Sequence, residues 1–251
     1  MRPWYETAFE ADYLDRYPHR DDAEARRDVA AIVRLLESAP ARPLLDLGCG
    51  AGRHLVAFWE AGFRSLVGLD LSSELLDVAR RRIAEAGGAN VELRCLDMRQ
   101  IPYENHFDVA VSLFTSFGYF ETDGENADVL RSVWRALRPG GRFLVDTLNR
   151  EWTIAHLVPH EEIDLPEGRG DVRRALSTDG ARVEKTVRTA AGNPPAEVVR
   201  RESVRMYAAE ELRAMFRDAG FTDVQAYGSL RGEPLGPDSR RLIVVGRKGT
   251  P

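Results

Sequence analysis

The chain has 251 residues, of which 43% are hydrophobic, and a formal net charge of -5. This length and composition predict one principal domain with a sizeable core. The negative charge argues against a nucleic-acid partner, whose affinity depends largely on neutralised phosphates. The sequence lacks a membrane-length apolar run and the residue order of a signal peptide, so we expect a cytoplasmic protein without a membrane partner.

Helices and strands alternate along the first half of the chain. Apolar spacing and end signals predict helices over residues 21–37, 52–62, 72–88 and 125–141, and strands over 44–48, 65–70, 90–97, 107–114 and 141–149. This order predicts an α/β fold, with a doubly wound, mostly parallel sheet covered by helices on both faces.

The alternation of strands and helices stops after residue 149. Residues 171–190 and 196–206 are typical of three short antiparallel strands. Helical spacing returns over 207–221, before two last strands. We therefore divide the chain into an N-terminal lid, a core, an antiparallel β insertion that caps the substrate or contacts another subunit, and a C-terminal segment that completes the core. These four parts span residues 1–28, 29–149, 150–205 and 206–251.

A glycine loop follows the first predicted strand, in the stretch LLDLGCGAGRHL. Gly48, Gly50 and Gly52 allow close approach of the backbone to a ligand in front of a helix N-terminus. The spacing departs from the dinucleotide-binding pattern GxGxxG, because the last glycine comes one position early and Arg53 stands where a small residue belongs. The loop therefore suits a ligand other than a pyrophosphate.

Two acidic residues close the next two predicted strands. Asp70 lies 20 residues after Gly50, where its carboxylate can accept hydrogen bonds from ribose hydroxyls, and Asp97 precedes Met98. The ends of three strands then form a strip of ligand contacts at the carboxyl edge of the sheet, where open α/β sheets bind ligands.

The stretches LLDLGCGAG, VGLDLS, CLDMRQIP, FDVAVSLF and LRPGGRFLVD resemble, in order, the motifs of class I S-adenosylmethionine-dependent methyltransferases, in their small-molecule branch. The resemblance implies a seven-stranded sheet with an antiparallel final strand. It implies that Asp46 and the Gly48 to Gly52 loop hold the methionine part of the cofactor, Asp70 the ribose, and Asp97 with Met98 the adenine. Cys49, Leu71 and Leu113 belong to the same implied cofactor site.

Arg53 is either a partner of the cofactor carboxylate or a structural arginine. Cys49 and Cys95 have no CxxC partner, so we expect buried thiols, without a disulfide. We predict no metal site. His156 and His160 are four residues apart, but the intervening Pro159 opposes the regular helix that such a site needs.

The run LFTSFGYF follows the fourth predicted strand, beside the cofactor strip. Leu113 and Phe114 are expected to finish the core, while Thr115, Ser116, Phe117 and Tyr119 border the transferred methyl. The reaction is an in-line displacement that requires alignment and exclusion of water. Our catalytic candidates are Tyr119, Ser116 and His156; our substrate-contact candidates are Tyr13, Tyr17, Arg20, Thr115, Phe117, Asn149 and Trp152.

We expect methyl transfer to N, O or C of a small molecule or a short peptide end, by a monomer or a homodimer. A nucleic-acid or protein methyltransferase is an alternative, opposed for nucleic acid by the net charge and by the missing Pro-Pro-Tyr motif. An NAD-dependent oxidoreductase has only the glycine loop and Asp70 in its favour. A binding module that keeps the cofactor site but has lost turnover is the third alternative.

Overall fold

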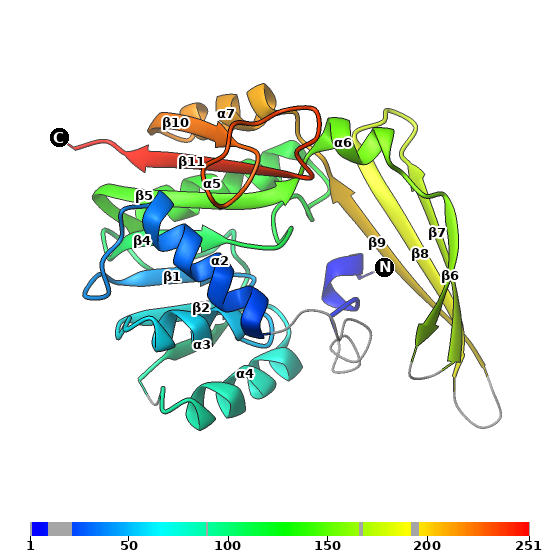
Figure 1. Cartoon of the computed structure of the whole chain (residues 1–251), viewed down its shortest axis with the longest axis horizontal. Helices are drawn as coiled ribbons and strands as arrows, with labels where there is room; N and C mark the ends of the chain where they lie inside the picture. The colour runs from blue at the N-terminus through cyan, green and yellow to red at the C-terminus, as the bar shows by residue number, and fades with distance from the viewer. Residues whose placement is uncertain (1, 10–21, 89, 166–167, 192–195, 251) are drawn as a thin grey trace.

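The computed structural model describes residues 2–9, 22–88, 90–165, 168–191 and 196–250. Within this part of the chain, a seven-stranded sheet has the strand order β10-β11-β5-β4-β1-β2-β3, and a four-stranded sheet has the order β6-β7-β8-β9 (Figure 1). β11 is antiparallel to both β5 and β10, whereas the other pairs in the large sheet are parallel. The predicted seven-stranded α/β fold is therefore confirmed.

The strands of the large sheet are β1 (Leu44–Leu47), β2 (Leu66–Asp70), β3 (Glu92–Cys95), β4 (Phe107–Ser112), β5 (Leu137–Leu148), β10 (Phe221–Tyr227) and β11 (Arg241–Lys248). The helices are α2 (Asp22–Leu35), α3 (Arg53–Glu60), α4 (Ser73–Glu85), α5 (Asp123–Ala136), α6 (Arg150–Ala155) and α7 (Ala209–Asp218), with a short 3-10 helix η1 (Trp4–Glu6).

Alternate residues of the central strands face opposite layers. Leu45 and Leu47 of β1 join a cluster with α5 and α7, whereas Leu44 joins a second cluster with α2, α3 and α4. Because both faces are covered, the central strands are buried and apolar throughout, as in LLDL of β1. The helices therefore sandwich the sheet and leave its strand ends exposed for a site.

Side chains cap the starts of α4 and α5, and α5 begins at Asp123, two residues before its predicted start at residue 125. The Ser72 hydroxyl accepts the backbone N–H of Leu75 at the start of α4, as predicted for this residue. Thr122 and Glu125 form a reciprocal capping box at the start of α5. The helix α6 was not predicted; it ends at Ala155, so His156 and His160 do not share a helix.

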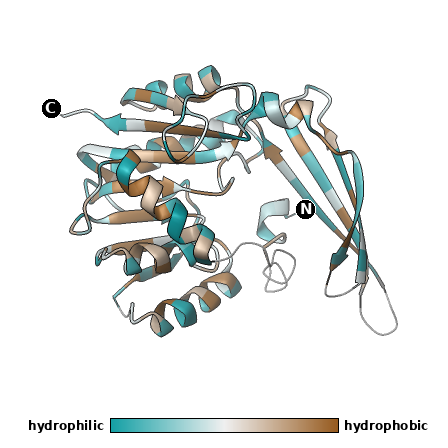
Figure 2. Cartoon of the chain, viewed as in Figure 1, coloured by the Kyte–Doolittle hydropathy of each residue, from teal (hydrophilic) through white to brown (hydrophobic). Residues whose placement is uncertain are grey.

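The insertion contains the strands β6 (His160–Leu165), β7 (Gly168–Leu176), β8 (Arg182–Ala191) and β9 (Ala196–Arg205). We predicted three short strands; the described insertion has four, and β8 and β9 have ten residues each. Figure 1 shows this sheet standing beside the carboxyl ends of the core strands, with η1 between the two. Figure 2 shows polar and apolar residues mixed along its strands, whereas the core strands are mainly apolar.

Candidate active site

A cavity of about 360 Å³ lies at the carboxyl ends of β1, β2 and β4. Nine of the residues proposed for the cofactor line it: Asp46, Gly48, Cys49, Gly50, Arg53, Asp70, Leu71, Met98 and Leu113. Ser116 and Tyr119 line it as well. We call it the cofactor cavity.

Two glycines of the loop lie so close to neighbouring residues that a side chain would not fit there. Gly48 has φ +67°, and a Cβ there would lie 2.7 Å from Cβ of Ser116. Gly52 has φ +76°, and a Cβ there would lie 2.9 Å from Cβ of Ala79. Gly52 is not among the residues that line the cavity, so its role in this structure is to let the loop pack against α4.

Two buried polar atoms fit the methionine part of the implied cofactor. Oδ2 of Asp46 accepts no hydrogen bond and Nη2 of Arg53 donates none among the described residues, although both atoms are buried. The ammonium of S-adenosylmethionine is a donor for the first atom, and its carboxylate is an acceptor for the second. Nη1 of Arg53 already pairs with Glu24 at 2.6 Å.

Burial and, to a smaller extent, the nearby Asp70 carboxylate raise the pKa of Asp46 to about 8, against the opposing effect of Arg53. Burial also raises the pKa of Asp70. A cationic ligand in this cavity would stabilise the charged form of both carboxylates. The electrostatics of the cavity therefore favour an ammonium or sulfonium over a phosphate.

Asp70 and Asp97 have different surroundings. The Asp70 carboxylate accepts the backbone N–H groups of Gly50 at 2.7 Å and Ser72 at 2.9 Å, which holds it at the cavity wall. Asp97 instead accepts several N–H groups of Arg99 and does not line the cavity. Met98 does line it, so the adenine role of Asp97 stays a prediction that this geometry does not support.

A second cavity, of about 470 Å³, lies between the core and the insertion. Its lining comes from η1, α6, the turn after β4, the start of β11 and one face of β6 to β9. Phe9, Phe114 and Tyr119 line both cavities, so they form a shared wall. We call this second space the acceptor cavity.

The shared wall is aromatic. The Tyr119 ring stacks on Phe9 with centroids 5.6 Å apart and meets Trp4 edge-on at 4.8 Å. Tyr5, which we predicted in the N-terminal lid, packs edge-on against Phe120 and lines the cofactor cavity. The N-terminal residues thus cover the junction of the two cavities. Tyr13, Tyr17 and Arg20 lie outside the described residues.

Four of the proposed residues line the acceptor cavity: Thr115, Tyr119, Trp152 and His156. His156 stacks on Trp152 with centroids 4.4 Å apart, and its Nδ1 lies 2.9 Å from the Trp152 carbonyl oxygen. A carbonyl oxygen can only accept, so Nδ1 carries the proton in this hydrogen bond. The neutral ring then presents Nε2 as a proton acceptor.

Three candidates have a structural position in the fold. The Ser116 hydroxyl donates to the Leu113 carbonyl at 2.9 Å, so it fixes the turn in which it lies. Phe117 is buried in the core and reaches neither cavity. Leu113 is buried in the core, as expected, and also lines the cofactor cavity, whereas Phe114, expected in the core, is only partly buried and lines both cavities. Asn149 caps α6 and donates to the Ser239 carbonyl, away from both cavities. Cys95, expected to be buried, is exposed.

Sequence reasoning missed the polar side of the acceptor cavity. Arg174 and Lys185 are direct partners across β7 and β8, and each pairs with a carboxylate, Glu161 at 2.5 Å and Glu202 at 3.3 Å. All four side chains line the cavity. Strand alternation assigns such residues to one face, but it does not reveal that this face meets the core.

Among the described residues, no group of three His, Cys, Asp or Glu side chains has the arrangement of a metal site. No helix in the same part of the chain is both long enough and apolar enough to span a bilayer.

Comparison with known proteins gives one domain match and several relatives of similar length. A family model described as a methyltransferase domain matches residues 44–141. The dTDP-3-amino-3,4,6-trideoxy-alpha-D-glucopyranose N,N-dimethyltransferase of Streptomyces venezuelae is 29% identical over 94% of this chain and 98% of its own. The dTDP-4-amino-2,3,4,6-tetradeoxy-D-glucose N,N-dimethyltransferase of Saccharopolyspora spinosa is 26% identical over 95% of this chain and 94% of its own.

The solved structure of the CcbJ methyltransferase from Streptomyces caelestis matches with a TM-score of 0.79 at 21% identity. The match covers 97% of this chain and 99% of that one, so the shared fold includes the insertion.

Proposed function

Because the chain is a class I S-adenosylmethionine-dependent methyltransferase, with its methyltransferase domain at residues 44–141, we propose that its acceptor is the amino group of an amino sugar. The two relatives named above carry amino-sugar N,N-dimethyltransferase names and align over more than nine-tenths of this chain. The alignment therefore covers the insertion that lines the acceptor cavity, in addition to the cofactor half.

One observation carries this proposal: the acceptor cavity adjoins the cofactor cavity across a shared wall. Its volume of about 470 Å³ lies in the range of small-molecule sites. The row of Glu161, Arg174, Lys185 and Glu202 offers both donors and acceptors, which a polyhydroxylated ring requires. The rings of Trp4 and Trp152 supply apolar faces in the same cavity.

The cofactor supplies an electrophilic methyl group on its sulfonium. The chain's own residues would hold the two reactants in the adjoining cavities, so that they meet beside Phe114 and Tyr119. Trp4 and Phe9 would exclude water from this junction. Aromatic faces at this wall also favour a positive charge beside them, by about 0.5–2 kcal/mol.

An attacking amine must be neutral. His156 is our candidate to accept its proton, because the Nδ1 hydrogen bond to Trp152 leaves Nε2 available in the acceptor cavity. His156→Gln is expected to lower kcat/KM by about 100-fold, the scale of general base catalysis, and to change its dependence on pH. An unchanged pH profile in this variant would remove His156 from the reaction.

A substrate panel tests the proposed acceptor. The purified protein is given S-adenosylmethionine with a dTDP-linked amino sugar, the same sugar without its amine, or a short peptide with a free N-terminus. We expect S-adenosylhomocysteine release and a mass gain of one or two methyl groups only with the amine-bearing sugar. Methylation of the peptide alone would replace the amino sugar with a peptide end. Turnover of none of the three would favour a non-catalytic binding module.

A further inference from the structure

Two of the three residues of the shared wall, Phe114 and Tyr119, belong to a single turn, residues 113–120. Phe114 comes from its first half and Tyr119 from its second, and each side chain lines both cavities. The in-line geometry of methyl transfer therefore depends on where this turn is held. The groups that hold it come from elsewhere in the chain.

The first half of the turn has a strained backbone. Phe114 and Thr115 have φ +56° and +67°, in the left-handed region that residues with a Cβ avoid. Such strain persists only where the surroundings over-determine it. Here the buried Asp146 of β5 accepts the Phe114 N–H at its carboxylate, 3.0 Å away, and the Thr115 N–H at its carbonyl oxygen, also at 3.0 Å.

Arg241 of β11 also holds the first half of the turn, through Asp146 and Thr115. Its guanidinium donates to the Asp146 carboxylate at 2.7 Å and to the Thr115 hydroxyl at 2.9 Å. Two guanidinium groups also lie over the Phe114 ring: that of Arg53, which lines the cofactor cavity, at 4.7 Å from the ring centroid, and that of Arg241, which lines the acceptor cavity, at 5.5 Å.

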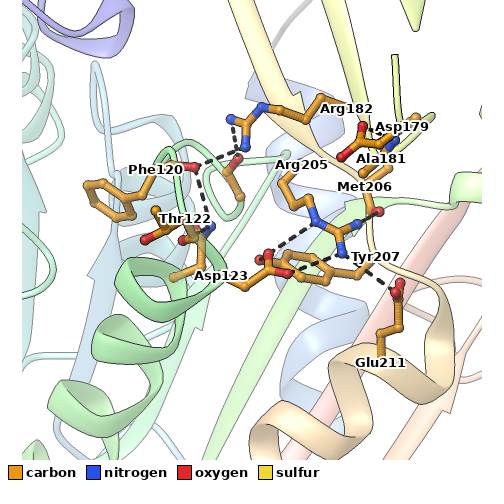
Figure 3. Close-up of polar contacts among 12 residues, drawn as sticks. Phe120, Thr122, Asp123, Asp179, Ala181, Arg182, Arg205, Met206, Tyr207 and Glu211 are labelled. Atoms are coloured by element: carbon orange, nitrogen blue, oxygen red, sulfur yellow. Dashed lines mark hydrogen bonds and ion pairs between the residues drawn. The ribbon is translucent and has the colours of Figure 1, made fainter. Parts of the chain in front are cut away.

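The second half of the turn is held by the insertion. Arg182, at the start of β8, donates to the carbonyl oxygens of residues 118–121, with the shortest contact of 3.0 Å to Phe120. Figure 3 shows its guanidinium reaching Phe120 from the insertion. The same side chain donates to the carbonyl oxygen and the hydroxyl of Ser203 on β9. One arginine thus joins β8, β9 and the turn.

The backbone of β9 meets the turn directly. The Arg205 N–H donates to the Gly118 carbonyl at 2.8 Å, and a Cβ on Gly118 would lie 2.6 Å from the Arg205 carbonyl oxygen. The Arg205 side chain pairs with Asp123 of α5, which also accepts the Tyr207 hydroxyl at 2.8 Å (Figure 3). This end of the insertion is therefore bound to the core. A change in the position of the Arg182 side chain would also change the position of the turn that carries Phe114 and Tyr119.

We propose that Asp146 and Arg182 are positioning residues for methyl transfer, which hold the turn 113–120 from its two ends and so set the distance between cofactor and acceptor. Neither side chain lines a cavity. The proposal rests on the proposed function only for its kinetic part, because the rigidity of the turn is measurable without an acceptor.

Arg182→Gln is the primary test, and Arg188→Gln is its matched control. Arg188 lies on the same strand and makes an exposed pair with Glu197 at 3.0 Å, far along the strand from the turn. In Arg182→Gln we expect kcat to fall by about 10–100-fold, as for a small displacement of the reacting groups, with unchanged affinity for S-adenosylmethionine. The control should keep the kcat of the unaltered protein.

Hydrogen exchange provides a readout that needs no acceptor. Amides of residues 113–121 should exchange faster in Arg182→Gln and in Asp146→Asn, while those of the core strands β1 and β2 stay protected. Guanidinium ion added to Arg182→Ala should restore part of kcat, because it can refill the space among the carbonyl oxygens.

Unchanged exchange in residues 113–121 in both variants would overturn the proposal, whatever the acceptor proves to be. An equal kcat loss in Arg188→Gln would also overturn it, since the effect would then be a general one of the insertion. If the unaltered protein turns over no amine, the proposed function fails. The exchange result still shows whether Asp146 and Arg182 hold the turn 113–120.

Discussion

The two cavities are built in different ways. The cofactor cavity takes most of its polar contacts from short stretches at the ends of neighbouring strands, such as Asp46 to Arg53. The acceptor cavity draws single side chains from η1, α6, β11 and all four strands of the insertion. The first site is therefore specified by local sequence and close packing, whereas the second depends on how distant elements are docked. We expect single substitutions in the cofactor cavity to cause large losses of stability or cofactor affinity, and those in the acceptor cavity to cause smaller, graded losses of activity.

The largest expected effect is that of Gly48→Ala. The new Cβ would meet Cβ of Ser116 at 2.7 Å on a backbone with φ +67°, so we expect a loss of about 2–4 kcal/mol in the free energy of unfolding. Gly87→Ala is the matched control, because Gly87 has φ +78° but nothing within 4 Å of the added atom. Denaturant titration should show a loss of about 1 kcal/mol there. Equal losses in the two variants would show that the loop is not closely packed.

Asp46→Asn should separate cofactor binding from stability. The variant loses the charge that fits the cofactor ammonium, so we expect affinity for S-adenosylmethionine to fall by about 10–100-fold in calorimetry. The free protein should become more stable to heat at neutral pH, because Asp46 must take up a proton when it is buried, whereas an amide is neutral in both the folded and the unfolded chain. A fall in both quantities would contradict this assignment of Asp46.

The pH dependence follows from the same residue. Burial raises the pKa of Asp46 from 3.8 to about 8, so between these values the folded chain holds a proton that the unfolded chain has released. The contribution of Asp46 to stability is therefore fully present below about pH 4 and is lost as the pH rises towards 8.

Cofactor binding should have the opposite trend, because the ammonium favours the carboxylate. We expect affinity for S-adenosylmethionine to rise about tenfold per pH unit towards pH 8 and then level off. Titrations at several pH values measure this slope, and Asp46→Asn should abolish it. A flat profile in the unaltered protein would mean that Asp46 is already ionised without ligand.

The smallest expected effect lies in the acceptor cavity. Lys185→Met removes one donor from the charged row but leaves Arg174 and the apolar walls in place. We expect the KM of the acceptor to rise by a few-fold, about 1 kcal/mol or less, because the Lys185–Glu202 pair is partly exposed. Affinity for S-adenosylmethionine should not change. A collapse of cofactor binding in this variant would mean that the two cavities are not separate in function.

The sequence determined the core fold because its signals are local. Apolar strands and the Ser72 cap depend on neighbouring residues, and both appear in the structure as predicted. In the glycine loop, Gly48 and Gly50 line the cavity as predicted, whereas Gly52 packs against α4. Most of the proposed cofactor residues line one cavity for the same reason, since parallel strands bring their carboxyl ends together.

The tertiary structure alone decided which residues line the acceptor cavity and which contacts hold the turn between the two cavities. Sequence reasoning placed Phe117 at the site and Phe114 in the core, and the structure exchanges them, because Asp146 and Arg241 stabilise a left-handed backbone at Phe114 and Thr115. Arg182 meets the turn across 62 residues of chain. Such contacts depend on the docking of the insertion on the core, and periodicity within either segment carries no information about it.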